Sequence, residues 1–179
     1  MPSKPAGRSP LGRPARFFLL LALCLLLGFG LVLTPPAQDL TTRFSLSLVS
    51  LSHSLIAPFD AHAHHNGAIL INPATGFGVE MKDGCNAVNV TILFWAAVLA
   101  YPASWRWKAL GLALGTLLIQ ALNVVRFISL FYIGQYSATW FDFAHGYLWE
   151  TLIVLDSLVL FWLWVHRAAR SLPSPHAPA

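Results

Sequence analysis

The stretch that decides the class of this protein covers residues 109–133, ALGLALGTLLIQALNVVRFISLFYI. Arg126 is the only charged residue in it. A helix needs about 20 predominantly apolar residues to cross the hydrocarbon core of a bilayer. The stretch therefore predicts a transmembrane helix, and we expect other apolar segments of the chain to pack beside it.

The composition of the whole chain supports a membrane protein. Of its 179 residues, 56% are hydrophobic and only 10% are charged, whereas soluble domains are about one quarter charged. Three further apolar segments, at 17–33, 85–101 and 147–165, are candidate spans. Together with 109–133 they predict an all-α membrane protein built as a four-span helical bundle.

The first apolar segment has two interpretations. Residues 17–33 carry no charge and follow four basic residues, as in a cleaved signal peptide. The following TPPAQ lacks a small-x-small cleavage site, which favours a retained span with Cys24 as a packing or lipid-facing residue. The Pro-, Ser- and Ala-rich ends at 1–15 and 171–179 predict disordered tails, which leaves a single membrane domain over residues 16–170.

Basic residues are concentrated on one side of the predicted bundle. Eight of the eleven lie before the first span, between the second and third, or after the fourth, and no acidic residue does. The positive-inside rule then places both termini in the cytoplasm and residues 34–84 outside. These residues flank apolar segments and form no stripe among surface aromatics, so we expect no nucleic-acid partner. The eight are Lys4, Arg8, Arg13, Arg16, Arg106, Lys108, Arg167 and Arg170.

The external segment begins with an amphipathic pattern at 40–59, LTTRFSLSLVSLSHSLIAPF. Apolar residues at helical spacing opposite serines are typical of a helix that lies on the outer leaflet. Phe44, Leu46 and Leu48 also alternate, so a strand is the alternative, and Pro58 ends either element. The apolar face of the helix would consist of Phe44, Leu48, Leu51 and Leu55.

A small external β-hairpin is predicted at residues 67–81, GAILINPATGFGVEM. Two short β-type runs surround the turn residues 72–76, NPATG. Such a hairpin would deliver the chain to Gly84 and Cys85 at the membrane surface.

Cys85 stands at the outer end of the second predicted span. Asn86 follows it, and Asn89 comes one helical turn later on the same face. A cysteine at a helix N-terminus has its thiolate stabilised by free amide groups and the helix dipole. The alternative is that Cys85 is only a small residue that begins a membrane helix.

Arg126 lies at a similar depth in the third span. It follows Lys108, at the inner face, by 18 residues, or roughly 27 Å at helical rise. A charge inside a membrane helix is costly and is kept mainly for function, and Asn123 at i−3 faces the same way. The alternative is an arginine that snorkels to the outer surface.

His145 completes a trio at the start of the fourth span. An imidazole can move a proton near neutral pH, and Glu150 can orient it or pair with Arg126. A thiolate attacks a carbonyl, a fixed cation stabilises the oxyanion and an imidazole transfers the proton. Cys85, Arg126 and His145 therefore predict acyl-transfer chemistry at the outer face. We expect the Cys85 thiol and the His145 imidazole to lie within roughly 4 to 8 Å of each other.

Other polar residues suggest further classes of site. His62, His64 and His65 could form a metal site, but the partner motifs of zinc sites are missing, so solvated histidines are the preferred interpretation and we expect no metal or cofactor. Asp156 and Glu150 in the fourth span could serve a proton-coupled transporter, but the chain has no inverted repeat.

The ordered trio resembles the core of the exosortase/archaeosortase family. The resemblance covers roughly residues 83–167, and Cys85, Arg126 and His145 match the three catalytic positions of the family. The short length and the single long external segment are most similar to the compact exosortase H subgroup. Larger members have several more spans before the cysteine.

The resemblance implies a cysteine protease or transpeptidase, multi-pass in the inner membrane of Gram-negative bacteria, with its active site facing the periplasm. Its partners would be exported proteins that end in a short motif, a transmembrane helix and a basic cluster, cleaved near the motif. Asn123, Asn89 and Glu150 would support the site. The alternative function is a non-enzymatic factor for envelope export or assembly.

Small residues in the third span could receive another helix by close packing. Gly111, Ala113 and Gly115 form this set. A substrate tail could lie beside them, but packing between the protein's own spans is the preferred interpretation for Gly111 and Gly115.

Overall fold

The computed structural model describes residues 12–170 of the chain. The tail residues 1–11 and 171–179 lie outside this range, and the first helix begins at Arg13, within the range expected for the N-terminal tail. In chain order, the elements are α1 (Arg13–Val32), α2 (Pro35–Ile56), β1 (His64–Asn66), β2 (Ile69–Asn72), β3 (Phe77–Glu80), α3 (Val88–Ala100), α4 (Trp105–Tyr136), α5 (Ala138–Phe143), the π-helix η1 (Ala144–Leu148) and α6 (Trp149–Arg170).

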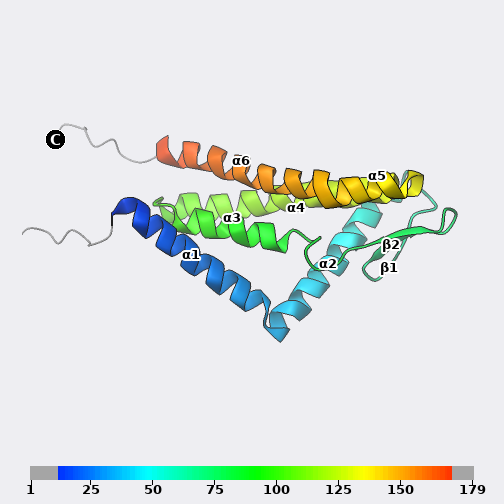
Figure 1. The fold of residues 1–179 in the computed structure, drawn as a ribbon, viewed down its shortest axis with the longest axis horizontal. Coiled ribbons are helices and arrows are strands. Elements are labelled where there is room, and N and C mark those ends of the chain that lie inside the picture. Colours follow the sequence, from blue (N-terminus) through cyan, green and yellow to red (C-terminus); the bar gives the residue numbers. More distant parts are fainter. Residues whose placement is uncertain (1–11, 171–179) are drawn as a thin grey trace, which may run out of the picture.

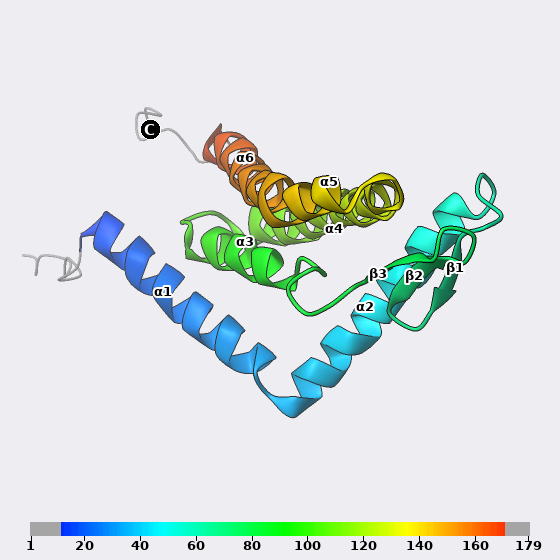
Figure 2. The same cartoon turned by 45° about the vertical axis from the view of Figure 1, so that its right-hand side comes forward.

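The helices form a bundle with a small sheet at one end. Helices α3, α4 and α6 contact one another, and α1 packs against α3. Helices α5, η1 and α6 follow one another as one long rod, whereas α1 and α2 meet at a sharp corner and form a V (Figures 1 and 2). The sheet packs against α2 and α4 and lies beside the α2 arm of this V (Figure 2).

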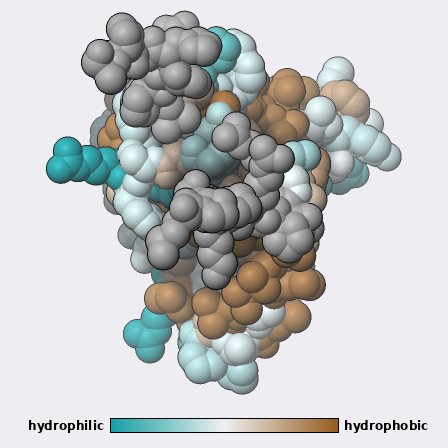
Figure 3. Space-filling model, turned by 90° about the vertical axis from the view of Figure 1, so that its left-hand side faces the viewer, coloured by the Kyte–Doolittle hydropathy of each residue, from teal (hydrophilic) through white to brown (hydrophobic). Residues whose placement is uncertain are grey.

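Within residues 12–170, three helices are long and apolar enough to cross a membrane: Pro14–Val32, Trp105–Tyr136 and Ala138–Ala169. Large apolar side chains of these helices are exposed, and hydrophobic residues reach the surface in Figure 3. Exposed apolar surface of this kind suits contact with lipid chains, as expected for a protein that spans a bilayer.

The second predicted span, 85–101, is corrected by the structure. Helix α3 has only 13 residues, which is about 20 Å at helical rise, against about 30 Å of hydrocarbon. It starts late because Gly84 and Ala87 have positive φ angles, and it ends before Pro102 because the residue preceding a proline avoids the helical region. The bundle thus contains three full-length candidate spans and one shorter apolar helix.

The amphipathic segment is a helix, α2, and the strand alternative is wrong. Its buried face differs from the predicted one, because Ser45 and Ser52 point inward while Leu51 and Leu55 are exposed. The two buried serines are accommodated because each donates its hydroxyl to a carbonyl four residues earlier, at Thr41 and Leu48. The buried residues are Ser45, Leu48, Val49, Ser52 and Ile56.

The predicted hairpin is part of a three-stranded antiparallel sheet in the order β1-β2-β3. The added strand, β1, pairs His64 with Ile71 and Asn66 with Ile69. Sequence patterns missed it because HHN has no β-type side chains; its position depends on backbone pairing with β2. The sheet is attached to the end of α4, where the Asn72 amide donates to Gln135 Oε1 over 2.7 Å.

Glycines let the protein's own helices approach closely. A Cβ at Gly111 would collide with the Trp164 ring of α6, and one at Gly115 with the Phe94 ring of α3. The preferred interpretation of Gly111 and Gly115 is therefore confirmed: both serve internal packing.

Substituting Gly115 with Ala should lower the thermal midpoint of the purified protein in detergent. The methyl group overlaps Phe94, and overpacking costs about 1–3 kcal/mol, more than the ~1 kcal/mol gained in helix propensity. Gly30→Ala in α1 is the matched control, because nothing lies within 4 Å of its Cβ position. Equal midpoints for the two variants would contradict tight packing of α3 on α4.

Candidate active site

Cys85 lies in a turn that precedes α3, so the expectation that it starts a helix is corrected. Gly84 has a φ of 92° and Ala87 a φ of 56°, which bends the chain before Val88. The Asn86 side chain, only 1% exposed, stabilises this turn. Its Oδ1 accepts from the Val88 amide over 3.1 Å, and its Nδ2 donates to Ser45 Oγ over 3.1 Å.

Asn86 is thus a positioning residue that sequence reasoning passed over. Its bond to the Val88 amide is an Asx turn, which asparagine favours directly before a helix. That signal was present in the sequence. The second bond, to Ser45 on α2, joins segments 41 residues apart and could not be inferred from local pattern.

His145 contacts Cys85 directly. Its Nε2 lies 3.4 Å from Cys85 Sγ, closer than the sequence-based expectation. It belongs to the π-helix η1 between α5 and α6. The fourth span was predicted to cover 147–165, so His145 lies just before its predicted start. Single π-helical turns inside α-helices often occur at functional sites.

Aromatic packing sets the orientation of the imidazole. The Phe141 ring stacks on His145, with centroids 5.6 Å apart and planes at 18°. Phe77 of β3 packs its edge against Phe141, and Gly134 of α4 leaves room for Phe77. Packing against the sheet and α4 therefore fixes the position of the stacked Phe141 and His145 rings. No local sequence motif pointed to the residues that do this.

Arg126 lines the same small hollow as the Cys85 thiol and the His145 imidazole. Its side chain is 3% exposed, so the snorkelling alternative is wrong. Nη2 lies 3.8 Å from Glu150 Oε1 and has no hydrogen-bond partner within residues 12–170. The lining residues are Val79, Glu80, Cys85, Arg126, Phe127, Leu130 and His145.

Two predicted supporting residues do not act as expected. Arg126 was expected to be held by Asn123 or Glu150, and Glu150 of α6 is the residue that pairs with it. Neither side-chain amide atom of Asn123 has a hydrogen-bond partner in the described part of the chain. Asn89 is exposed and lines a different hollow, together with Thr41 and Asn86, because α3 starts three residues after Cys85. Glu150 is the one of the three that pairs with Arg126.

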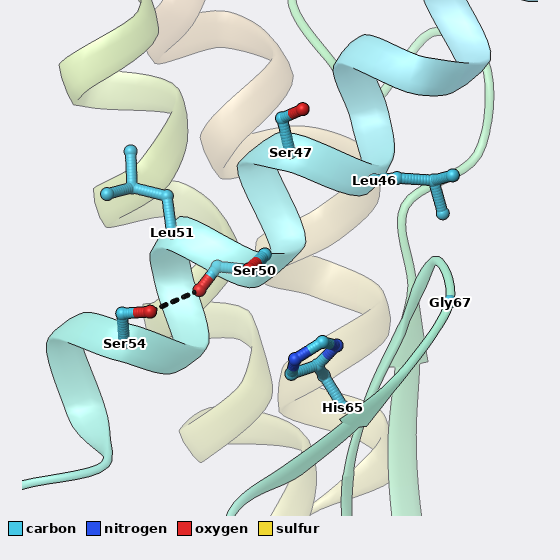
Figure 4. A pocket seen from close by; sticks show the side chains of 7 residues that line it. All are labelled: Leu46, Ser47, Ser50, Leu51, Ser54, His65 and Gly67. Atoms are coloured by element: carbon cyan, nitrogen blue, oxygen red, sulfur yellow. Dashed lines mark hydrogen bonds between the residues drawn. The ribbon is translucent and has the colours of Figure 1, made fainter.

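His62, His64 and His65 lie apart from this hollow. His65 borders a separate groove between α2 and β1, beside Ser50 and Ser54 (Figure 4), which does not include Cys85. His62 and His64 are exposed. Within residues 12–170, no group of three or more His, Cys, Asp or Glu side chains is arranged to hold a metal.

The geometry brings together the parts of a thiol-based acyl-transfer site. A nucleophile within reach of a base is the first requirement of covalent catalysis, and Cys85 and His145 meet it. A buried cation with an unused donor beside them suits a developing oxyanion. Glu150 neutralises part of the charge of Arg126.

Comparisons with known proteins place the chain in a family. No curated protein and no solved structure matches the chain significantly. The family model described as Transmembrane exosortase (Exosortase_EpsH) matches residues 6–175, nearly the whole chain. Exosortases are membrane transpeptidases that process C-terminal sorting signals. The chain is a multi-pass membrane protein that belongs to the transmembrane exosortase family.

Proposed function

We propose that the protein is a membrane-embedded cysteine transpeptidase that cleaves the C-terminal sorting tails of exported proteins, with Cys85, His145 and Arg126 as its catalytic residues. The observation that carries the proposal is the 3.4 Å contact between Cys85 Sγ and His145 Nε2, in a hollow that Arg126 also lines. Its substrates end in a short motif, a hydrophobic helix and a basic cluster.

The chemistry proceeds in two half-reactions. His145 Nε2 takes the thiol proton, and Cys85 Sγ attacks the carbonyl carbon of the scissile peptide bond. The tetrahedral oxyanion forms beside the unused Nη2 donor of Arg126. When the C–N bond breaks, the imidazolium returns the proton to the leaving amine and a thioester remains on Cys85. The amine or hydroxyl of an acceptor then displaces the thiol and forms the new bond.

A non-enzymatic assembly factor is the competing function, and the two cysteines separate it from the enzyme. Cys85→Ala should abolish tail cleavage, because no other group in the hollow can form the thioester. Cys24→Ala is the matched control and should cleave normally, because Cys24 lies in α1, outside the hollow. Immunoblots of a tail-bearing substrate in cells, at equal membrane levels of each variant, measure this. Cleavage by Cys85→Ala at the wild-type rate would reject the enzyme.

Arg126→Lys tests whether the guanidinium acts by geometry or by charge alone. Lysine keeps the charge but loses the planar fork of donors. Loss of one oxyanion donor typically costs about 10²–10³ in rate, so we expect a loss of that order in tail processing. Arg126→Ala serves as the reference for complete removal. If the lysine variant processes tails at nearly the normal rate, Arg126 has a structural role only.

The side of the membrane that Cys85 faces follows from charge. Basic residues concentrate before and at the start of α1, in the first turn of α4 and near the end of α6. By the positive-inside rule this distribution supports a periplasmic position for Cys85, at the opposite end of the bundle. A membrane-impermeant maleimide should therefore label Cys85 in intact cells in a Cys24→Ala background. Labelling that requires lysis would place the site in the cytoplasm.

A further inference from the structure

Three residues of α4 form a row of unpaired polar groups. Gln120, Asn123 and Arg126 follow one another at i, i+3 and i+6, and each has at least one buried side-chain atom without a hydrogen-bond partner within residues 12–170. Asn123 is the extreme case, since it is 0% exposed and both its Oδ1 and Nδ2 are unpaired. A buried polar group left unpaired costs about 1–3 kcal/mol, and native proteins contain few of them.

A groove on the surface of the bundle includes the first residue of this row, Gln120. It lies between α3 and α4, where Ala109, Ala113, Thr116 and Gln120 line one face of α4 and Trp95 forms the wall. Trp95 is held there by its Nε1, which donates to Thr116 Oγ1 over 2.7 Å. Small residues at such spacing let another helix approach closely in a membrane.

This groove is distinct from the internal contacts of α4. The face that carries Gly111 and Gly115 is filled by Trp164 and Phe94. Ala113, in contrast, is exposed. At 100° per residue, it lies about half a turn around α4 from Gly111 and Gly115. The face of α4 that carries Ala113 is therefore open to an occupant from the membrane.

The polar row runs along α4 from the groove toward the residue that shares a hollow with the thiol. Gln120 lines the groove, and Arg126 lines the hollow with Cys85. Each step of three residues advances about 4.5 Å and turns about 60° around the helix, so the row winds from one to the other. Asn123 stands halfway along it.

We propose that the groove between α3 and α4 holds the hydrophobic helix of the sorting tail, and that Gln120, Asn123 and Arg126 bind the backbone that links this helix to the scissile bond. The proposal rests on the proposed function. The first four N–H groups of a helix have no partner inside it, and in lipid they must find one. Gln120 Oε1 and Asn123 Oδ1 are unpaired acceptors at that level, which a lipid chain cannot use.

The geometry sets the length of the linking segment. Gln120 and Arg126 are six residues apart on α4, which is about 9 Å along the axis. An extended chain covers about 3.3 Å per residue. The scissile bond should therefore lie about three residues before the first turn of the tail helix.

A pair of Ala→Trp variants tests the groove. Ala113→Trp fills it and should reduce tail processing at least tenfold. Ala121→Trp is the matched control: Ala121 is also an exposed alanine of α4 but does not line the groove, so it should process normally. Equal processing by the two variants would overturn the groove as the docking site.

Disulfide cross-linking gives a readout that does not require activity. In a Cys24→Ala, Cys85→Ala background, Ala113→Cys should cross-link to single cysteines along one face of a tail helix, and Ala121→Cys should not. Cross-links at neither position, or at Ala121→Cys alone, would overturn the proposal. If wild type cleaves no tail while Ala113→Cys still cross-links, the proposed function fails and docking stands.

Asn123→Leu separates recognition from folding. Removing an unpaired buried carboxamide should leave the thermal midpoint in detergent unchanged or higher, because apolar packing replaces an uncompensated polar group. Tail processing should nevertheless fall at least tenfold, since the substrate backbone loses its partner. A lower midpoint with a matching loss of processing would assign Asn123 a structural role and overturn its part in the row.

Discussion

The Cys85 turn depends on one constraint: a chain that leaves helical structure beside a membrane must find its hydrogen bonds within the protein. Asn86 meets that constraint. It accepts from the backbone of α3 and donates to Ser45 of α2, so the turn, α2 and α3 are held together at one point. The contact between Cys85 and His145 is possible because this turn is fixed, and the same bond gives the inward-facing Ser45 of α2 a partner.

Helix α4 is the second element on which the site depends. It runs unbroken through 32 residues, with Gly111 and Gly115 near its start, Arg126 about two thirds of the way along and Gly134 near its end. Phe77 of the sheet packs over Gly134, and through Phe141 that packing orients the imidazole. The small sheet thus contributes to the site without providing a catalytic group.

Unpaired polar atoms gather around the site and not elsewhere in the apolar core. Gln120, Asn123, Arg126 and Trp149 hold all the buried side-chain atoms without partners that the described residues contain. Under the proposal that the groove holds the tail helix, a peptide backbone entering from the groove would pair with the groups of Gln120, Asn123 and Arg126. The free energy that these unpaired groups cost the protein without substrate would be recovered when they bind the non-helical backbone of the substrate.

Much of this protein follows from sequence, because the bilayer allows few solutions. Long apolar runs with basic flanks determine the membrane class and the long helices, and a buried arginine, a cysteine and a histidine at matching positions along those helices point to one site. Only the tertiary structure decided that α3 is short, that β1 joins the sheet, that Ser45 faces inward, and that Glu150 and not Asn123 meets Arg126. These outcomes depend on contacts between segments far apart in the chain, whose energies no local period or spacing encodes.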